Sequence, residues 1–318
     1  MNSHHKTELS EPVHYVGLDV SKARLDYLIE AGTPASVPNT SVGHATLIAR
    51  LREVPGARVV CEASGGYERA LLAALWAAQL GACRVPPGRV RHYARAEGLW
   101  AKTDRIDAAL LGRYARSMQP RLEQPVPAEC LTLRELLDYR RQLSEQHTAT
   151  GNRLEQAGPT LHELLTAQLQ HLATGLAQAE AAIQAHLHAH PGLQAKAERL
   201  RQLQGVGPIL ATTLLAYLPE LGHEDDKRIA ALVGVAPYAH DSGEASRPRH
   251  ARGGRIEVRN VLYMAAVSAA QHNPVLSAFY QRLRESGKPA KVCLTAVMRK
   301  MIVVLNRMLR DPHFSLVS

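Results

Sequence analysis

Acidic residues at the ends of apolar runs constrain the fold of this chain more than any other feature. They lie in three short strings, Val16-Gly-Leu-Asp-Val-Ser-Lys22, Val59-Val-Cys-Glu-Ala-Ser-Gly-Gly-Tyr67 and Lys102-Thr-Asp-Arg-Ile-Asp107. Asp19 ends one apolar run and Glu62 ends another. Asp104 and Asp107 lie three residues apart in a helix-like stretch, so they share one helix face. Acids at strand ends and an acid pair on a helix can converge into a set of oxygen ligands, which suits Mg²⁺.

Two metal ions bound in this way, about 3.5–4 Å apart, would hold the attacking and leaving oxygens of a phosphodiester. Each acid taken alone is better explained as a helix cap or a solvated surface charge. The four acids together, in this order and in these local settings, favour the metal site.

The composition points to a polyanionic partner. The chain has 318 residues, 46% of them hydrophobic, which is enough for two or three domains with real cores. Lys and Arg number 38 against 29 Asp and Glu, a net charge of +9, which favours nucleic acid or an acidic membrane surface as partner. Aromatic residues make up only 4%, which argues against stacking platforms for single-stranded nucleic acid.

Nothing in the sequence predicts membrane insertion or export. No run of 18 apolar residues occurs, and residues 1–8 are polar without an apolar core. The four cysteines are scattered without a Cys-x-x-Cys spacing, which predicts free buried thiols in a reducing compartment. We therefore expect a cytoplasmic protein.

The first part of the chain has the pattern of an α/β domain. After a loose tail over residues 1–12, strands are predicted at 14–19, 24–30, 35–38, 57–62 and 83–86. Helices are predicted at 43–52, 66–80, 89–97 and 103–118, the last with Thr103 as N-cap. Three strands, then helix, strand, helix, strand and helix, is the order of a ribonuclease-H-like core. We expect this domain to span residues 13–125.

A proline-rich break at 120–127 precedes a region without strand character. Apolar residues there follow 4-3-4-3-4 spacing, at Leu165, Leu169, Leu172, Leu176, Ala179 and Ile183. This spacing predicts either a coiled-coil stalk between subunits, over residues 126–195, or an antiparallel helix pair within one chain, broken at Gly158-Pro159. The first alternative predicts a homo-oligomer, a dimer or a tetramer.

Residues 196–318 form a third predicted unit, which is helical and basic. The string around Gly205 and Gly207 resembles a helix-hairpin-helix, whose backbone amides can meet a phosphate without reading sequence. An ordinary turn between helices fits it nearly as well. From Ser242 to Arg310, 13 Lys and Arg stand against 3 Asp and Glu, so this unit carries the excess charge.

A serine close to a cluster of arginines is the second feature with chemical content. Ser242 lies beside Gly243, and arginines follow at Arg247, Arg249, Arg252, Arg255 and Arg259. Guanidinium groups can bind a phosphate bidentately and stabilise charge that develops on it, which transfer of a phosphate to serine would require. A solvated loop that only touches phosphates, with Ser242 as a turn residue, explains the same residues. Spacing alone leaves Ser246 as another reactive serine.

The chain resembles the DEDD transposases of the insertion-sequence one-hundred-and-ten family. The strings that carry the resemblance are Gly17-Leu-Asp-Val-Ser-Lys22, Glu62-Ala-Ser-Gly-Gly-Tyr67, Lys102-Thr-Asp-Arg-Ile-Asp-Ala108, Leu203-Gln-Gly-Val-Gly-Pro208, Gly234-Val-Ala-Pro237, Asp241-Ser-Gly243, Arg252-Gly-Gly-Arg255 and Leu262-Tyr-Met-Ala265. They extend over nearly the whole chain and occur in the family's order. One mild departure is Ser64-Gly65, where the family often has Thr-Gly.

The resemblance implies a fold, a chemistry and partners. The fold would be a RuvC-like ribonuclease-H domain, a helical coiled-coil stalk and a mainly helical C-terminal transposase domain. Asp19, Glu62, Asp104 and Asp107 would be the metal-binding catalytic acids, with two Mg²⁺ ions, and Ser242 the nucleophile that becomes joined to DNA. The partners would be donor and target DNA duplexes and a structured non-coding RNA that pairs with both, so that base pairing reads the sequence. The resemblance also implies a bacterial protein associated with the nucleoid.

Other classes remain open from the residues alone. A RuvC-like endonuclease for Holliday junctions would use the four acids and a metal-activated water, and would not need Ser242. A DNA-bridging protein with an inert core would need none of the acids. An actin-like sugar kinase would require a second glycine-rich Asp-x-Gly turn, which the sequence lacks.

Overall fold

The computed structural model describes residues 13–29, 32–99, 104–238 and 250–314. The chain divides into two compact units, residues 1–125 and residues 126–318. The second unit contains both the long helices that follow the proline-rich break and the basic C-terminal helices. A further division near residue 195 therefore stays a prediction.

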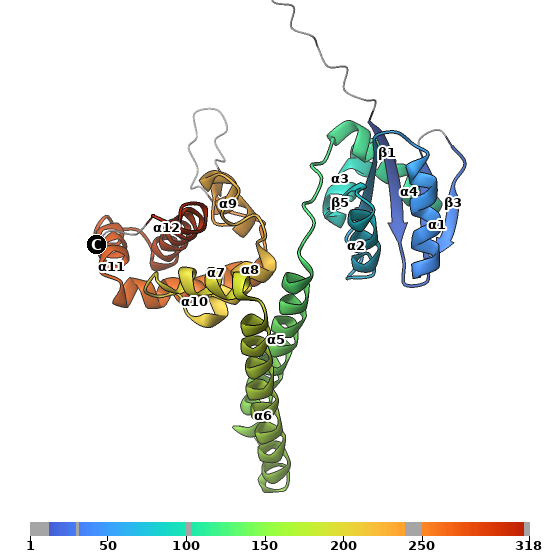
Figure 1. Cartoon of the computed structure of the whole chain (residues 1–318). Helices are drawn as coiled ribbons and strands as arrows, with labels where there is room; N and C mark the ends of the chain where they lie inside the picture. Colours follow the sequence, from blue (N-terminus) through green and yellow to red (C-terminus); the bar gives the residue numbers. More distant parts are fainter. Residues whose placement is uncertain (1–12, 30–31, 100–103, 239–249, 315–318) are drawn as a thin grey trace, which may run out of the picture. The chain divides into compact units, whose positions relative to one another are not determined.

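A five-stranded mixed sheet forms the centre of the first unit (Figure 1). Its strands are β1 (His14–Val20), β2 (Arg24–Ile29), β3 (Ala35–Pro38), β4 (Ala57–Glu62) and β5 (Gly81–Val85). In space they follow the order β3-β2-β1-β4-β5, with β1, β4 and β5 parallel and β2 antiparallel to β1. This is the ribonuclease-H-like arrangement that the sequence predicts, and it confirms the α/β fold of this unit.

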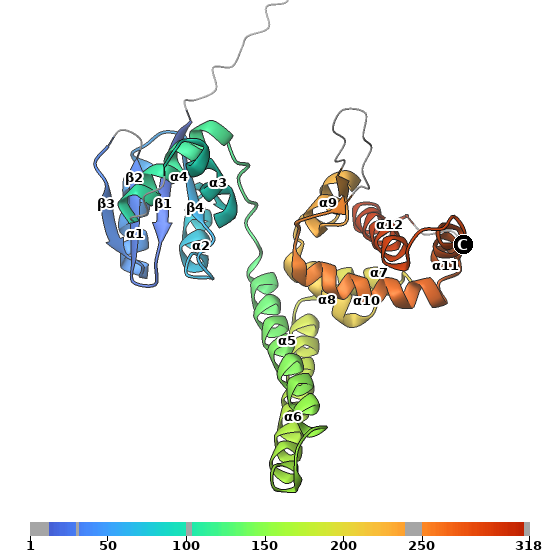
Figure 2. The same ribbon diagram turned by 180° about the vertical axis from the view of Figure 1, so that it is seen from behind.

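Helices cover both faces of the sheet because the central strands are apolar on both sides. Val16, Leu18 and Val20 of β1 pack with α1 (Ser41–Arg52) and α2 (Arg69–Ala77). Tyr15, on the opposite face, packs with α3 (Pro87–Ala96) and α4 (Asp104–Met118). Figure 2 shows α3 and α4 from the side on which they cover the strands.

The predicted elements of this unit are confirmed, with shifts of one to three residues in several of their bounds. Helix α2 begins at Arg69 and not at Gly66, because the Gly65-Gly66 turn before it is held by the Glu68 carboxylate. Strand β5 begins two residues earlier than predicted, at Gly81. The predicted N-cap Thr103 lies outside the described residues.

The segment that leaves the first unit covers the open edge of its sheet. The backbone amide of Glu123 donates to the carbonyl of Ala82 (3.0 Å), and the amide of Arg84 donates to the Glu123 carboxylate (2.8 Å). Leu122 lies so close to Gly81 that a Cβ there would be 2.7 Å from its Cδ1. These contacts satisfy the Ala82 carbonyl and the Arg84 amide on the outer edge of β5, where unpaired backbone groups could pair with other chains.

The second unit begins with an antiparallel pair of long helices, α5 (Ala128–Leu154) and α6 (Pro159–Ala189). The break between them lies at Gly158-Pro159, as the intrachain alternative predicts. Leu172 and Ala179 of the apolar seam are buried against Leu143 of α5, and Arg140 pairs with Glu180 across the helices (2.7 Å). The seam is thus occupied within one chain, so its 4-3 spacing no longer argues for a contact between subunits.

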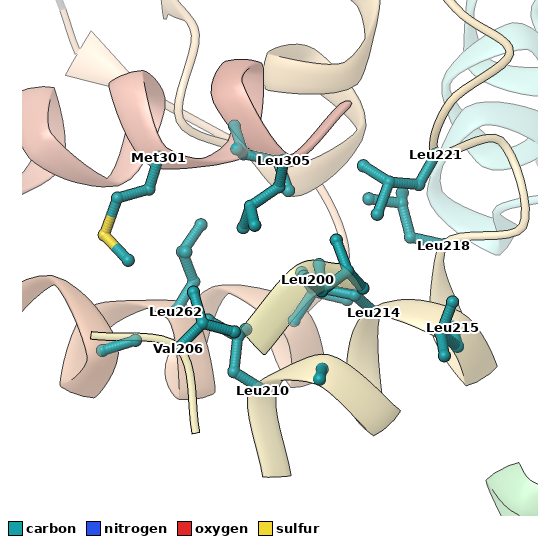
Figure 3. Packing of buried hydrophobic residues seen from close by; sticks show 14 of the residues in the cluster. Leu200, Val206, Leu210, Leu214, Leu215, Leu218, Leu221, Leu262, Met301 and Leu305 are labelled. Atoms are coloured by element: carbon teal, nitrogen blue, oxygen red, sulfur yellow. The ribbon is translucent and has the colours of Figure 1, made fainter. Parts of the chain in front are cut away.

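Further helices complete the second unit around a large apolar core (Figure 3). They are α7 (Pro191–Arg201), α8 (Pro208–Tyr217), α9 (Asp226–Val233), α10 (Ile256–His272), α11 (Pro274–Glu285) and α12 (Ala290–Arg310). Leu200, Leu214 and Leu305, from three different helices, are fully or almost fully buried there. Two short strands, β6 (Pro237–Tyr238) and β7 (His250–Ala251), form a separate hairpin.

The predicted helix-hairpin-helix corresponds to α7, α8 and the turn between them. Gly205 has a φ of +103°, and a Cβ at this position would lie 2.7 Å from the Cβ of Ala269 on α10. Glycine is therefore required here by packing as well as by backbone conformation. Gly207 is the exposed N-cap residue of α8.

All four cysteines are buried and free, as the sequence predicts. Among the described residues, no helix is long and apolar enough to cross a membrane.

Candidate catalytic acids and the serine-bearing segment

Asp19 and Glu62 lie at the same level on neighbouring parallel strands. The register of β1 and β4 pairs Leu18 with Cys61, so the next residue on each strand is one of the two acids. Parallel neighbours stand about 4.8 Å apart and point to the same face of the sheet. Both side chains are half-buried at the carboxyl ends of their strands. The sheet register therefore brings these two acids to neighbouring positions at one edge of the sheet.

Helix α4 packs on the same face of the sheet, against β1. A Cβ on Gly17 would overlap the carbonyl oxygen of Ala108 and the amide nitrogen of Gly112. Tyr15, two residues earlier on β1, packs in the cluster that contains Tyr114, further along α4. Residues of β1 that lie closer to Asp19 therefore pack against residues that lie closer to the start of α4.

The backbone of α4 begins at Asp104, at the end of the helix nearest to Asp19. The structure describes this backbone but not the side chains of Asp104 and Asp107. Among the side chains that it does describe, no three His, Cys, Asp or Glu residues form a group able to hold a metal ion.

The donors fit a hard divalent cation in type, because the two described acids supply only carboxylate oxygen. Two carboxylates held side by side repel one another unless a cation lies between them or one is protonated. Asp19 and Glu62 would contribute the strand side of a metal site, and α4 would contribute the other side.

Sequence reasoning missed Glu68, which is only 3% exposed. Its Oε2 accepts hydrogen bonds from the amide of Ser64 (3.2 Å), the hydroxyl of Ser64 (2.9 Å) and the amide of Gly66 (3.0 Å). Burial by itself would raise the pKa of Glu68, but hydrogen bonds from its own amide, from Ser64 and from Gly66 hold that pKa below its ordinary value. Glu68 therefore fixes the turn that directly follows Glu62.

Arg84 connects this turn to the covering segment of β5. Its Nη1 lies 3.5 Å from Glu68, and its Nη2 lies 2.9 Å from Glu123. Burial alone would lower the pKa of the Arg84 guanidinium, but its hydrogen bond and ion pair with Glu123 raise it. The sequence offers only one signal for this cluster of Glu68, Arg84 and Glu123, namely that Glu68 follows Glu62 by six residues. Such a spacing is too common to indicate a cluster.

The serine-bearing segment lies outside the described residues, and so do Ser242, Ser246, Arg247 and Arg249. The structure describes its two ends, where the antiparallel hairpin pairs Pro237 with Ala251. The chain on either side of residues 239–249 is therefore held together by this hairpin.

Three arginines that follow the segment differ in their contacts. Arg255 forms a bidentate ion pair with Glu220, with both N–O distances 2.6 Å, and its backbone amide donates to Leu232 (2.9 Å). Arg259 donates to the carbonyl of Gly253, whereas Arg252 is exposed. Arg255 and Arg259 thus have structural partners at the base of the segment.

Comparison with known proteins identifies the chain. Residues 16–163 match the family model of DEDD transposases of the IS110 type, described as "Transposase", and residues 197–281 match the model described as "Transposase IS116/IS110/IS902 family". Together the two matches define a transposase. The chain belongs to the IS110 family of DEDD transposases. Membership in a DEDD family implies dependence on a divalent metal.

Curated relatives extend over most of the chain. The pilin gene-inverting protein of Moraxella bovis is 26% identical over 93% of this chain and 96% of its own length. The protein of the same name from Moraxella lacunata is 27% identical over 80% of each chain. An uncharacterized 44.8 kDa protein of insertion element IS116 from Streptomyces clavuligerus is 31% identical over 36% of this chain and 30% of its own.

Among solved structures, RuvC of T. thermophilus in complex with a Holliday junction substrate aligns with 35% of this chain and 100% of its own. The TM-score is 0.28 and the sequence identity 15%.

Proposed function

We propose that this transposase cuts and rejoins DNA through a covalent serine–DNA intermediate, assisted by Mg²⁺ bound to Asp19, Glu62, Asp104 and Asp107. The observation that carries the metal site is the register of β1 and β4, which puts Asp19 beside Glu62 on the face where α4 begins. When bound to these carboxylates, the metal would stabilise negative charge on phosphate oxygens.

Ser242 would act as the nucleophile. Its hydroxyl oxygen forms a bond to phosphorus, the bond between phosphorus and one deoxyribose oxygen breaks, and the serine proton passes to that departing oxygen. The number of phosphoester bonds is unchanged, so the reverse reaction can rejoin strands without ATP. Arg247, Arg249 and Arg252 would offset the charge on the phosphate during transfer.

Rejoining is favoured over hydrolysis by the relatives. The printed names of the two Moraxella proteins state the inversion of a gene, and inversion requires that cut ends are joined again. The rival function, a metal-dependent endonuclease of the RuvC type, would use the acids and a metal-activated water and would not need Ser242.

Nucleic acid would bind mainly to the second unit. Gly205 and Gly207 would present the amides at the start of α8 to a phosphate, and the arginines after Ser242 would contact the backbone. Arg255 and Arg259 would act chiefly by holding the base of the serine-bearing segment, because each has a partner within the chain. Guidance by a structured non-coding RNA, and assembly as a dimer or tetramer, rest on the family resemblance.

Variants of Ser242 and Asp19 test the chemistry. The substrate is a DNA duplex that carries the element's end, together with the RNA transcribed beside the gene. Ser242→Ala should keep nucleic-acid binding but lose both strand cleavage and the covalent protein–DNA adduct seen on a denaturing gel. Asp19→Asn should lose the same two products.

Ser246→Ala is the matched control for Ser242→Ala and should retain both products. Free DNA ends produced by Ser242→Ala at the wild-type rate would identify the chain as a metal nuclease and refute the serine mechanism.

A further inference from the structure

Asn39 connects the two loops that follow Asp19 and Glu62. It lies after β3, directly before the N-cap residue of α1. Its side-chain amide donates to the carbonyl of Ser21 (2.8 Å) and to the carbonyl of Tyr67 (3.1 Å). Ser21 is two residues beyond Asp19, and Tyr67 is five residues beyond Glu62. One amide group therefore bridges both acid-bearing segments.

The orientation of this amide is fixed by His44 on α1. Nε2 of His44 lies 2.8 Å from Oδ1 of Asn39, and the imidazole is only 6% exposed. Because the Asn39 nitrogen gives its hydrogens to two carbonyls, Oδ1 must accept, so Nε2 of His44 must carry the proton. Burial lowers the pKa of His44, which favours the neutral ring.

Each loop is also fixed at a second point. The backbone amide and hydroxyl of Ser21 close the β1–β2 turn on the carbonyl of Arg24 (3.0 and 2.9 Å). The Glu68 carboxylate holds Ser64 and Gly66 in the other loop. Asn39 is thus a cross-link between two segments that are each held by hydrogen bonds of their own, and such a cross-link limits how far the two acid-bearing loops can move apart.

We infer that Asn39, oriented by His44, is a positioning residue that holds Asp19 and Glu62 at the separation required for divalent-metal binding. This role rests on the metal site proposed above. Side chains that orient metal ligands without binding the metal themselves typically contribute roughly ten- to a hundredfold to metal affinity. The role differs from a catalytic one, because Asn39 acts through the backbone of the two loops and not on the phosphate.

Asn39→Asp tests this role with almost no change in volume. The carboxylate cannot donate to the two carbonyls, so the cross-link is lost and replaced by repulsion. Binding of Mn²⁺ to the full-length chain is measured by electron paramagnetic resonance, and the Mg²⁺ dependence of strand cleavage is measured separately. We expect both half-saturation concentrations to rise about tenfold or more, while the cleavage rate at saturating Mg²⁺ falls much less.

Thr40→Ala is the matched control. It removes the neighbouring hydrogen bond to the amide of Gly43 (3.3 Å), which caps α1 without touching either loop. It should lower the melting temperature without changing Mn²⁺ affinity. His44→Ala, which releases the amide but leaves Asn39 in place, provides a second test if Asn39→Asp does not fold, and it should weaken Mn²⁺ binding in the same direction.

Wild-type Mn²⁺ affinity in both Asn39→Asp and His44→Ala would overturn the positioning role. Equal losses of affinity in Thr40→Ala would also overturn it, because the effect would then reflect general loosening of α1. If Asp19→Asn binds Mn²⁺ as the wild type does, the metal site itself is wrong and the role of Asn39 falls with it.

Discussion

At the residue scale, the Glu68 carboxylate combines deep burial with a lowered pKa, so its contribution to stability must depend on pH. A carboxyl group whose pKa is lower in the folded than in the unfolded chain stabilises the fold above its unfolded pKa of about 4.3. That contribution disappears as the pH falls through the folded pKa. Glu68→Gln should therefore lower the free energy of unfolding at pH 7 by about 1–3 kcal/mol.

Urea denaturation at pH 7 and pH 3.5 measures this effect. The difference between Glu68→Gln and the wild type should shrink at the lower pH. Glu53→Gln changes an exposed carboxylate in the same unit and should have little effect at either pH. A constant difference across this range would mean that shape, and not charge, determines the contribution of Glu68.

Gly17 provides a second test at this scale. Gly17→Ala places a methyl group where the backbone of α4 lies, so the helix must move away from β1. We expect the free energy of unfolding to fall by about 1–3 kcal/mol. We also expect weaker Mn²⁺ binding, because α4 carries two of the proposed ligands. Gly88→Ala is the control, since a Cβ there meets nothing within 4 Å and alanine favours the helix.

The same scale shows how far the sequence could predict the site. Asp19 and Glu62 could be paired because each ends an apolar strand, and parallel strands end at one edge of a sheet. Asn39 and Glu68 could not be found in this way. Both side chains form hydrogen bonds with backbone groups in turns. The spacing of residues along the chain does not indicate which carbonyl or amide a side chain will bind.

At the element scale, the loop between α11 and α12 and the start of α12 carry two basic side chains, Lys288 and Lys291. Arg307 is bound to Asp226 and Arg255 to Glu220, but among the described residues Lys288 and Lys291 have no carboxylate partner. Lys291 lies in the first turn of α12, where the helix dipole disfavours a cation. An external polyanion explains this charge better than local structure does.

The double variant Lys288→Gln/Lys291→Gln should bind duplex DNA more weakly. The slope of log affinity against log salt concentration should become shallower by about 0.9 for each phosphate that is no longer neutralised. The control Arg153→Gln/Lys196→Gln removes two exposed charges from helices elsewhere in the same unit and should leave the slope unchanged. Equal slopes for both double variants would assign the effect to net charge alone.

The seam of α6 shows why the sequence left its partner open. Leucine and alanine at 4-3 spacing form the same apolar stripe whether the facing helix belongs to this chain or to another. The Gly158-Pro159 break was the signal for a hairpin, and α5 does fill the stripe. The order and type of elements in the first unit were easier to predict, because β-branched runs and helix-period runs alternate clearly there.

At the scale of the whole molecule, the boundary near residue 125 separates two compact units. A fragment of residues 13–125 should fold cooperatively, because it keeps Leu122 and Glu123 on the edge of β5. A fragment of residues 13–118 contains the same helices and strands but uncovers that edge. We expect it to be less stable and to aggregate, as measured by thermal unfolding and light scattering. Equal stability and solubility of the two fragments would contradict the covering role of residues 119–125.

The covering segment also determines how the first unit responds to mechanical tension. Any pull transmitted along the chain from residue 126 reaches the pairing of Glu123 with Ala82 and Arg84 before it reaches the apolar core. We expect these few hydrogen bonds to break at lower force than the apolar core. The segment could therefore peel away and lengthen the connection between the units while the strands that carry Asp19 and Glu62 stay folded.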